Sequence, residues 1–204
     1  MMKKQEFVPR KISEKPLYEL KSVEDIPVSE LYQVKINGKE QRVYHTEFFD
    51  FVSFLDENEK AEVEVTVNEP FQKAVIRPAA APFEEEGNKI SISLPAGKRI
   101  TLELDDKLES PLYVLPGKYI PKPENATYVF ESGKAYNVGC LQLNSDETVY
   151  IEYGAVVSGR IYSRMADRVR ILGNGILYGG NWHAWDENGA EQLIVPVLGE
   201  NIEI

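Results

Sequence analysis

Val149-Tyr150-Ile151-Glu152-Tyr153-Gly154-Ala155-Val156-Val157-Ser158-Gly159 is followed, twenty residues later, by Val169-Arg170-Ile171-Leu172-Gly173-Asn174-Gly175-Ile176-Leu177-Tyr178-Gly179. A less complete copy precedes both, opening at Val129 and ending at Gly139. A β-branched run opens each unit and a glycine closes it. A fixed period of about 20 residues indicates a solenoid, whose units must stack because none buries its apolar face alone. The alternative is three strands of an ordinary sandwich, spaced by coincidence.

A parallel solenoid stacks each strand on its equivalent one turn later, so a strict period predicts ladders of like residues. We expect one inward ladder of Val129, Val149 and Val169, with Ile151 over Ile171. The glycines that close the units are expected at corners where the backbone is left-handed or tightly packed: Gly139, Gly159 and Gly179.

The period breaks after Gly179. Residues 180–189 form a polar and aromatic insertion, residues 193–198 resume as strand, and Asn201-Ile202-Glu203-Ile204 resembles the start of another unit. An incomplete solenoid exposes apolar surface and strand edges that terminal caps normally cover. We therefore expect the chain to self-associate through its C-terminal coil.

The preceding part of the chain alternates between short strand patterns and turn signals, which indicates a β-sandwich. Glu62–Val67 alternates strictly, and Asn37-Gly38 is typical of a type I′ turn, with residues 42–45 as the return strand. Glu84-Glu85-Glu86 is expected in a solvated loop, in preference to an acidic ligand site. Prolines between residues 105 and 123 mark a boundary.

The predicted fold class is therefore all-β, with an N-terminal β-sandwich followed by the first coils of a right-handed parallel β-helix. We expect an N-terminal arm at residues 1–23, the sandwich at 24–118 and an incomplete β-helix at 119–204. The one cysteine, Cys140, lies in a strand-like run and is expected to be a small core residue.

The composition excludes several partners. A formal net charge of -10 argues against binding nucleic acid or anionic membranes. No run approaches the roughly 18 apolar residues of a membrane span, and no apolar leader follows the basic start. The chain is expected to be cytoplasmic, or secreted if a leader was removed.

Two segments resemble a known family. Thr148–Gly159 resembles the first full coil of right-handed parallel β-helix glycoside hydrolases, and Arg168–Gly179 resembles their next coil, where a Gly-x-Gly-x-hydrophobic-Asp-Gly pattern is usual. Tyr178 stands where those enzymes commonly carry Asp, and Trp182 follows at a typical spacing. The families are the polygalacturonases and the enzymes dextranase and isopullulanase, of which the latter two carry a β-sandwich before the helix.

The resemblance implies hydrolysis of a polysaccharide or oligosaccharide by inversion, with clustered aspartates on a middle coil as acid and base. No position here matches those aspartates, which would belong to coils after Ile204. We therefore expect no catalytic residue in this chain and no activity from it alone. A non-catalytic carbohydrate- or protein-binding module is the alternative, and a structural solenoid is a third reading.

The insertion supplies the candidate substrate-binding residues, Trp182, His183 and Trp185, because indole faces stack on sugar rings. The neighbouring acids Asp186 and Glu187 are adjacent, so they point apart and do not suit paired catalysis. His45 and His183 belong to different predicted domains, so no metal site is expected. Gly173-Asn174-Gly175 lies between strand-like runs with no helix after it, so no dinucleotide or other cofactor is expected.

Overall fold

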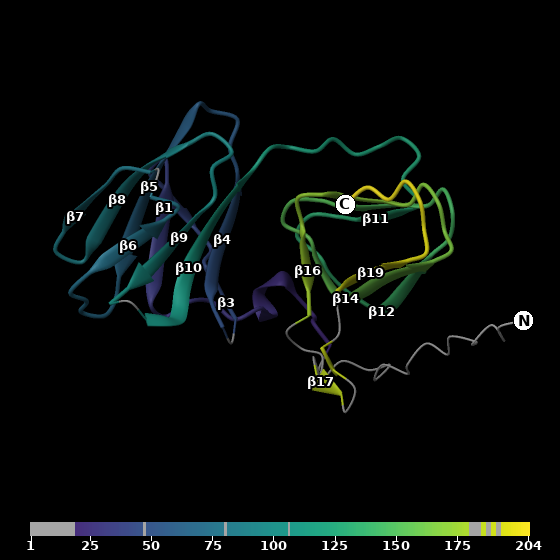
Figure 1. Ribbon diagram of the computed structural model, residues 1–204, viewed down its shortest axis with the longest axis horizontal. Helices are drawn as coiled ribbons and strands as arrows, with labels where there is room; N and C mark the ends of the chain where they lie inside the picture. Colours follow the sequence, from purple (N-terminus) through teal and green to yellow (C-terminus); the bar gives the residue numbers. More distant parts are fainter. Residues whose placement is uncertain are drawn as a thin grey trace, which may run out of the picture. The chain divides into compact units, whose positions relative to one another are not determined.

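The computed structural model describes residues 19–46, 48–79, 81–105, 107–179, 185–186, 189–190 and 193–204; the side chains of 107–109, 185–186, 189–190 and 195–197 are left aside. The described residues form strands and one short 3₁₀ turn, η1 (Val23–Asp25). Contacts divide the chain into two compact units, Glu24–Lys122 on one hand and Pro123–Ile204 with Met1–Val23 on the other (Figure 1). The all-β prediction is confirmed.

The Glu24–Lys122 unit is a sandwich of two five-stranded sheets. The first has the order β2-β1-β5-β8-β7 and the second β3-β4-β10-β9-β6. In chain order the strands are β1 (Tyr32–Ile36), β2 (Lys39–Gln41), β3 (Tyr44–His45), β4 (Asp50–Leu55), β5 (Lys60–Val67), β6 (Ala74–Arg77), β7 (Phe83–Glu86), β8 (Lys89–Pro95), β9 (Ile100–Leu104) and β10 (Lys107–Gly117).

Alternation along the strands builds the sandwich core. The valines of β5 are buried and its intervening residues face outward, as the strict alternation of Glu62–Val67 predicts. They pack with side chains from both sheets, including Val52, Ile90 and Leu102. One face of each sheet is therefore dry, and the other is left to polar side chains.

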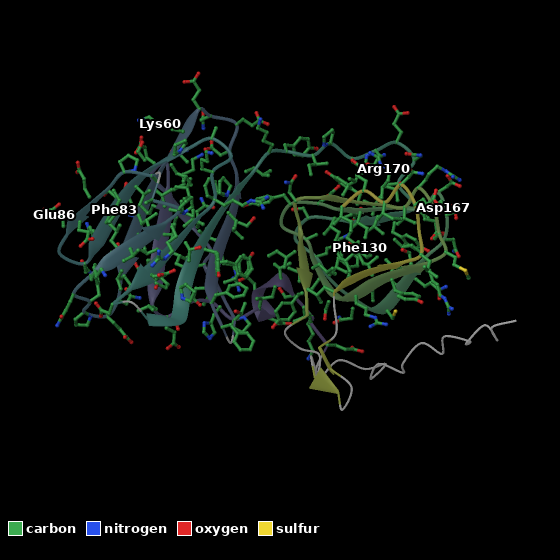
Figure 2. The ribbon with its side chains drawn as sticks, viewed as in Figure 1. Lys60, Phe83, Glu86, Phe130, Asp167 and Arg170 are labelled. Carbon is green, nitrogen blue, oxygen red and sulfur yellow. The ribbon has the colours of Figure 1, made fainter. Side chains whose placement is uncertain are left out.

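Two local expectations in the sandwich are wrong. Asn37 and Gly38 both have positive φ, as a type I′ turn requires, but the return strand is Lys39–Gln41 and not residues 42–45. Tyr44–His45 instead pairs with β4 in the other sheet. Glu84-Glu85-Glu86 is not a loop but part of the exposed edge strand β7, where like charges discourage pairing with another chain (Figure 2).

The Pro123–Ile204 unit is a stack of parallel coils. One sheet has the order β11-β13-β15, and another has β12-β14-β16, with β19 also pairing with β14. The strands are β11 (Tyr128–Phe130), β12 (Ala135–Leu143), β13 (Thr148–Ile151), β14 (Val156–Arg164), β15 (Arg170–Gly173), β16 (Ile176–Tyr178) and β19 (Ile194–Val197), with the short pair β17 (Trp185–Asp186) and β18 (Gly189–Ala190) between the last two. Every pairing between successive coils is parallel, which defines a β-helix.

The interior of the coils is apolar. Figure 2 shows Phe130 among the side chains that fill it. Val149, Val157 and Ile161 are almost completely buried there, one from each successive side of the second coil. These residues bury apolar surface only because neighbouring coils stack on them.

Several equivalent positions of neighbouring coils pair with the offset of twenty residues that the period predicts. Val156 pairs with Ile176, Val157 with Leu177, and Gly139 with Gly159, all twenty residues apart as expected. Both predicted ladders, that of Val129, Val149 and Val169 and that of Ile151 over Ile171, are wrong. Val149 instead lies between Tyr128 and Ile171, and Ile151 lies between Phe130 and Gly173.

Unequal corners explain the difference. Leu143 pairs with Ser163, twenty residues on, whereas Thr148 pairs with Arg170, twenty-two residues on, so the second coil has two extra residues in this corner. The next corner is shortened from residues 152–155 to residues 174–175, which restores the offset of twenty. The visible period is therefore an average over coils whose corners differ in length.

Gly139 and Gly159 stack where β12 and β14 bend. Both have positive φ, and a Cβ added to Gly159 would collide with the carbonyl oxygen of Gly139. The two glycines therefore lie within bent strands and allow close backbone approach. Cys140, the residue after Gly139 in β12, is exposed, so the expectation of a core cysteine is wrong. Its neighbour Leu141 packs on the core instead.

The residues after β19 begin a further coil, as expected. Glu203 forms a parallel bridge with Arg170, and Ile202 packs against the core of the coils. Asn201, Arg168 and Asp146 each precede their strand by two residues and share a positive φ, which marks the same corner on three coils.

Candidate functional site

The predicted substrate-binding insertion leaves the third coil at a defined place. β16 ends at Tyr178, where the equivalent strand β14 continues through Gly159, and the chain rejoins the stack only at β19. Trp182 and His183 lie outside the described residues. Trp185 belongs to β17, whose backbone pairs it with Ala190 of β18. The third coil thus carries a hairpin where the first two coils bend at a single glycine.

The face of β14 that turns away from the coil core carries cationic and aromatic side chains. Arg160 and Tyr162 alternate with Ile161, which lies in the core, so they project on the opposite side. The Arg160 guanidinium lies 5.8 Å from the centre of the Tyr162 ring. Although Tyr162 faces away from the core, its side chain is buried, with 7% of its surface exposed. This strand pairs with β19 immediately after the insertion, so the face borders the chain that returns from it.

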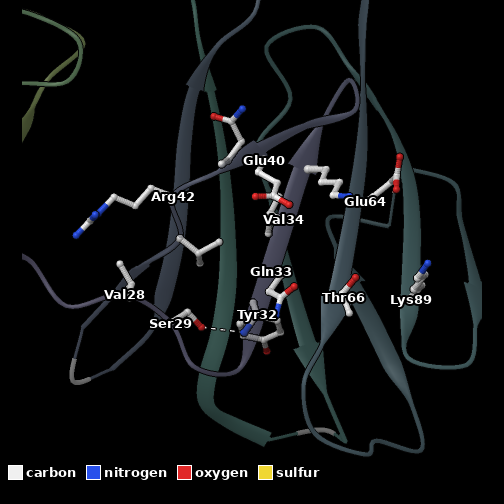
Figure 3. Close-up of a pocket in the computed structure, with 13 residues that line it drawn as sticks. Val28, Ser29, Tyr32, Gln33, Val34, Glu40, Arg42, Glu64, Thr66 and Lys89 are labelled. Atoms are coloured by element: carbon white, nitrogen blue, oxygen red, sulfur yellow. Dashed lines mark hydrogen bonds between the residues drawn. The ribbon is translucent and has the colours of Figure 1, made fainter. Parts of the chain in front are cut away.

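A second candidate site is a pocket of about 350 Å³ in the sandwich unit (Figure 3). Its floor is the outer face of the first sheet. The residues on this floor come from neighbouring strands at paired positions. They are Gln33 and Lys35 of β1, Glu40 of β2, Glu64 and Thr66 of β5, and Lys89 of β8.

The register arranges these side chains in two rows. Gln33 pairs with Thr66, and Thr66 pairs with Lys89. In the other row Lys35 lies between Glu40 and Glu64. Acids and bases are therefore interleaved over the floor, next to an amide and a hydroxyl, and no single sign of charge dominates.

The wall of the pocket is a ribbon formed by residues 27–29 and 43–45. Ser29 N–H donates to the Val43 carbonyl at 2.9 Å, and His45 N–H donates to the Pro27 carbonyl at 2.9 Å. Arg42 donates from Nη2 to the Ile26 carbonyl at 3.0 Å and forms an ion pair with Glu24. These bonds hold the ribbon before any ligand arrives.

The ribbon is tied to the sandwich core through the buried carboxylate of Asp50. Ser29 Oγ donates to Asp50 Oδ2 at 2.5 Å, and His45 Nδ1 lies 2.7 Å from Asp50 Oδ1. Ser29 Oγ also accepts the N–H of Tyr32 at 2.9 Å (Figure 3). Burial, together with the negative charge of Asp50, raises the pKa of the Tyr32 phenol well above its usual range.

Ser29, His45 and Asp50 are the residue types of a hydrolytic triad, but their connections differ from one. An active triad needs the serine bonded to the histidine, which removes its proton. Here both side chains bind the carboxylate instead. The cluster therefore serves to fix the ribbon, and it gives no activated nucleophile.

Other chemistries find little support in the part of the chain that the structure describes. No group of three or more histidine, cysteine, aspartate or glutamate side chains is placed to hold a metal ion there. Nor does any helix among those residues have the length and apolarity to cross a membrane. The buried acid Glu103 is engaged by Arg77 Nε, 3.0 Å from each carboxylate oxygen.

Comparison with known proteins adds one finding. No family model matches the chain, and no curated protein matches it. Among solved structures, it is similar to Dex49A from Penicillium minioluteum, with a TM-score of 0.64 and 14% identity over 85% of this chain and 52% of that chain. The chain therefore spans about half the length of that structure. At this identity the likeness shows the fold alone.

Sequence reasoning missed the sandwich pocket. Its floor residues look like ordinary solvated positions of alternating strands, and nothing local sets them apart. Only the pairing register, with Lys35 between two acids, brings them together. Arg42, which the sequence predicts to lie in a strand, lies outside the strands, and its guanidinium holds the wall.

Proposed function

We propose that these 204 residues are part of a glycoside hydrolase that acts on a polysaccharide. Residues 24–118 form its sandwich, residues 119–204 its first coils, and residues 1–23 an N-terminal arm. The observation that carries the proposal is the architecture: a sandwich followed by parallel coils, with a likeness to Dex49A over most of the chain. The resemblance of residues 148–179 to the coils of such enzymes supports it independently.

We infer inversion for the complete enzyme, with catalytic aspartates outside these 204 residues. Inversion needs an acid and a base about 6.5–9.5 Å apart across the sugar. Asp50 and Glu103, the buried carboxylates of the described chain, are each engaged, by Ser29 and His45 in one case and by Arg77 in the other. Neither is available to protonate a leaving oxygen.

The insertion on the third coil is proposed as a substrate contact. Trp182 and Trp185 would stack against sugar rings, and His183 would hydrogen-bond to hydroxyl groups. In support, the third coil carries the insertion with its β17–β18 pair where the first two coils have a single-glycine bend.

Activity assays on two proteins test the proposal. The 204-residue chain and the full natural gene product would each be incubated with neutral glucans and with pectate, and reducing ends and the anomeric form of the product would be measured. We expect cleavage with inversion by the full product and none by the 204-residue chain. Cleavage by the short chain would contradict the placement of the aspartates.

A non-catalytic carbohydrate-binding role is the second candidate, and the preformed sandwich pocket favours it. Tight binding of a polysaccharide by the full product, without release of reducing ends from any substrate, would establish that role in place of hydrolysis.

A further inference from the structure

We propose that the pocket on the first sheet of the sandwich binds a short stretch of a neutral oligosaccharide. This inference rests on the proposed function and adds to it a second carbohydrate site, separate from the β-helix, and a class of substrate. The pocket volume of about 350 Å³ lies at the lower end of the ~300–1,000 Å³ typical of ligand sites.

The polar groups of the floor are available to a ligand. No hydrogen bond or ion pair joins the side chains of Lys35, Glu64 or Lys89 to another described residue, although an acid and a base stand at paired positions. Ammonium groups donate only and carboxylates accept only, whereas a sugar hydroxyl does both. Sugar hydroxyl groups can therefore donate to Glu40 and Glu64 and accept from Lys35, which lies between these two acids.

The balance of charge selects against acidic sugars. Lys35 and Lys89 are offset by Glu40 and Glu64 on the same floor, and the third cation, Arg42, is already paired with Glu24. A uronate carboxylate would meet Glu40 or Glu64 at short range, and the chain as a whole carries a net charge of -10. A neutral oligosaccharide should therefore bind to the pocket more tightly than an oligosaccharide of uronates.

One side of the pocket is also an open sheet edge. Val34 pairs with Gln41 at the last position of the β1–β2 ladder, so β1 extends past the end of β2 at Tyr32 and Gln33. Ser29 Oγ accepts a hydrogen bond from the Tyr32 N–H and donates one to the Asp50 carboxylate. The wall is thus held by part-buried hydrogen bonds, which lowers the entropy cost of ordering it on binding.

Binding measurements on the 204-residue chain test the inference. Isomaltotriose, maltotriose and cellotriose would serve as neutral probes and trigalacturonate as the acidic one, followed by calorimetry and by amide shifts in NMR spectra. We expect at least one neutral trisaccharide to shift amides of β1, β5 and β8, and trigalacturonate to bind more weakly. Stronger binding of trigalacturonate, or no amide shift in these strands with any probe, would overturn the inference.

Matched variants locate the site. Glu64→Ala should weaken binding about tenfold, because it removes a charged hydrogen-bond acceptor from the floor. Glu85→Ala, on the exposed edge strand β7 of the same sheet, should leave affinity unchanged. Equal effects of the two variants would overturn the inference. Binding at this pocket and cleavage by the full product are measured in separate assays. Failure of this inference can therefore be told apart from failure of the proposed function.

Discussion

The side-chain amide of Asn137 holds the backbone of Leu20 through two hydrogen bonds. Leu20 N–H donates to Asn137 Oδ1 at 3.0 Å, and Asn137 Nδ2 donates to the Leu20 carbonyl at 2.8 Å. Ser158 of β14 pairs with Asn137. Ser158 is fully buried, although it lies on the side of the sheet that faces away from the core. The segment around Leu20, itself 3% exposed, therefore docks on the outer face of the coils.

Asn137→Ala should release this segment. Two backbone groups of Leu20 would lose their partners, at a cost of about 1–3 kcal/mol of local stability. We expect faster hydrogen exchange at residues 19–22 and faster tryptic cleavage after Lys21. Gln142→Ala, exposed on the same strand, is the control and should change neither. Unaltered exchange in Asn137→Ala would show that other contacts hold the segment.

Gly159→Ala should be among the most damaging substitutions in the coils. The new Cβ would meet the Gly139 carbonyl oxygen, and the backbone has a φ of +135°. Overpacking and backbone strain together should cost about 3 kcal/mol or more in urea unfolding followed by circular dichroism.

Gly133→Ala separates the two causes. Gly133 also has a positive φ of +74°, but nothing lies within 4 Å of an added Cβ. It should lose only about 1 kcal/mol, the cost of the backbone conformation. Similar losses in both variants would refute the close-approach argument.

The register of the coils can be checked at two valines. Val149 is completely buried, and Val149→Ala should cost about 1–3 kcal/mol. Val129 pairs with Tyr150 and not with Val149, so its side chain lies on the opposite side of the sheet from the core ladder. Val129→Ala should therefore cost less than about 1 kcal/mol in the same assay. A larger loss of stability in Val129→Ala than in Val149→Ala would contradict this register and favour the ladder of Val129, Val149 and Val169.

These valines also show what the sequence could predict. The pairing of Val156 with Ile176 and of Gly139 with Gly159 follows from the period. Between Val156 and Ile176 one corner is longer by two residues and the next is shorter by two, so the two changes cancel. A one-residue offset reverses the face of every side chain, so Val129 cannot be placed without the corner lengths. Corner length depends on tertiary packing, and no single-residue signal reveals it.

The same limit applies to the candidate sites. The insertion is visible because it breaks a period, and its exit after Gly179 could be predicted. The sandwich pocket depends on which strands pair across the sheet, since Lys35 and Glu64 are distant in the sequence and meet only through the β1–β5 register. Long-range strand pairing of this kind is not encoded in local alternation.

The ion pair between Asp146 and Arg168 joins equivalent corners of two coils and predicts a pH dependence. Arg168 donates from Nε and Nη2 to the two Asp146 carboxylate oxygens, at 2.6 and 2.8 Å, and this hydrogen bonding lowers the pKa of the Asp146 carboxyl below its usual value. Because the folded pKa is lowered, the stabilisation is fully present above the unfolded pKa near 3.9 and is lost as the pH falls through the folded pKa.

Carboxyl ¹³C titration by NMR would measure that shift. Arg168→Gln should return the Asp146 pKa to the ordinary range near 3.9. Arg170→Gln, whose guanidinium pairs with Glu203 instead, should leave it lowered. An Asp146 pKa that does not respond to Arg168→Gln would show that another group causes the shift.

The last prediction concerns association of the chain with itself through the C-terminal coil. Met165 and Leu198 occupy one corner on neighbouring coils, both with positive φ, and are 67% and 78% exposed. Adjacent apolar side chains exposed to this degree favour protein contacts. We expect light scattering to show concentration-dependent association that Leu198→Glu reduces, whereas Tyr119→Glu, at another exposed position, should not. A clean monomer at high concentration would contradict the prediction, because both side chains would then remain in water without driving assembly.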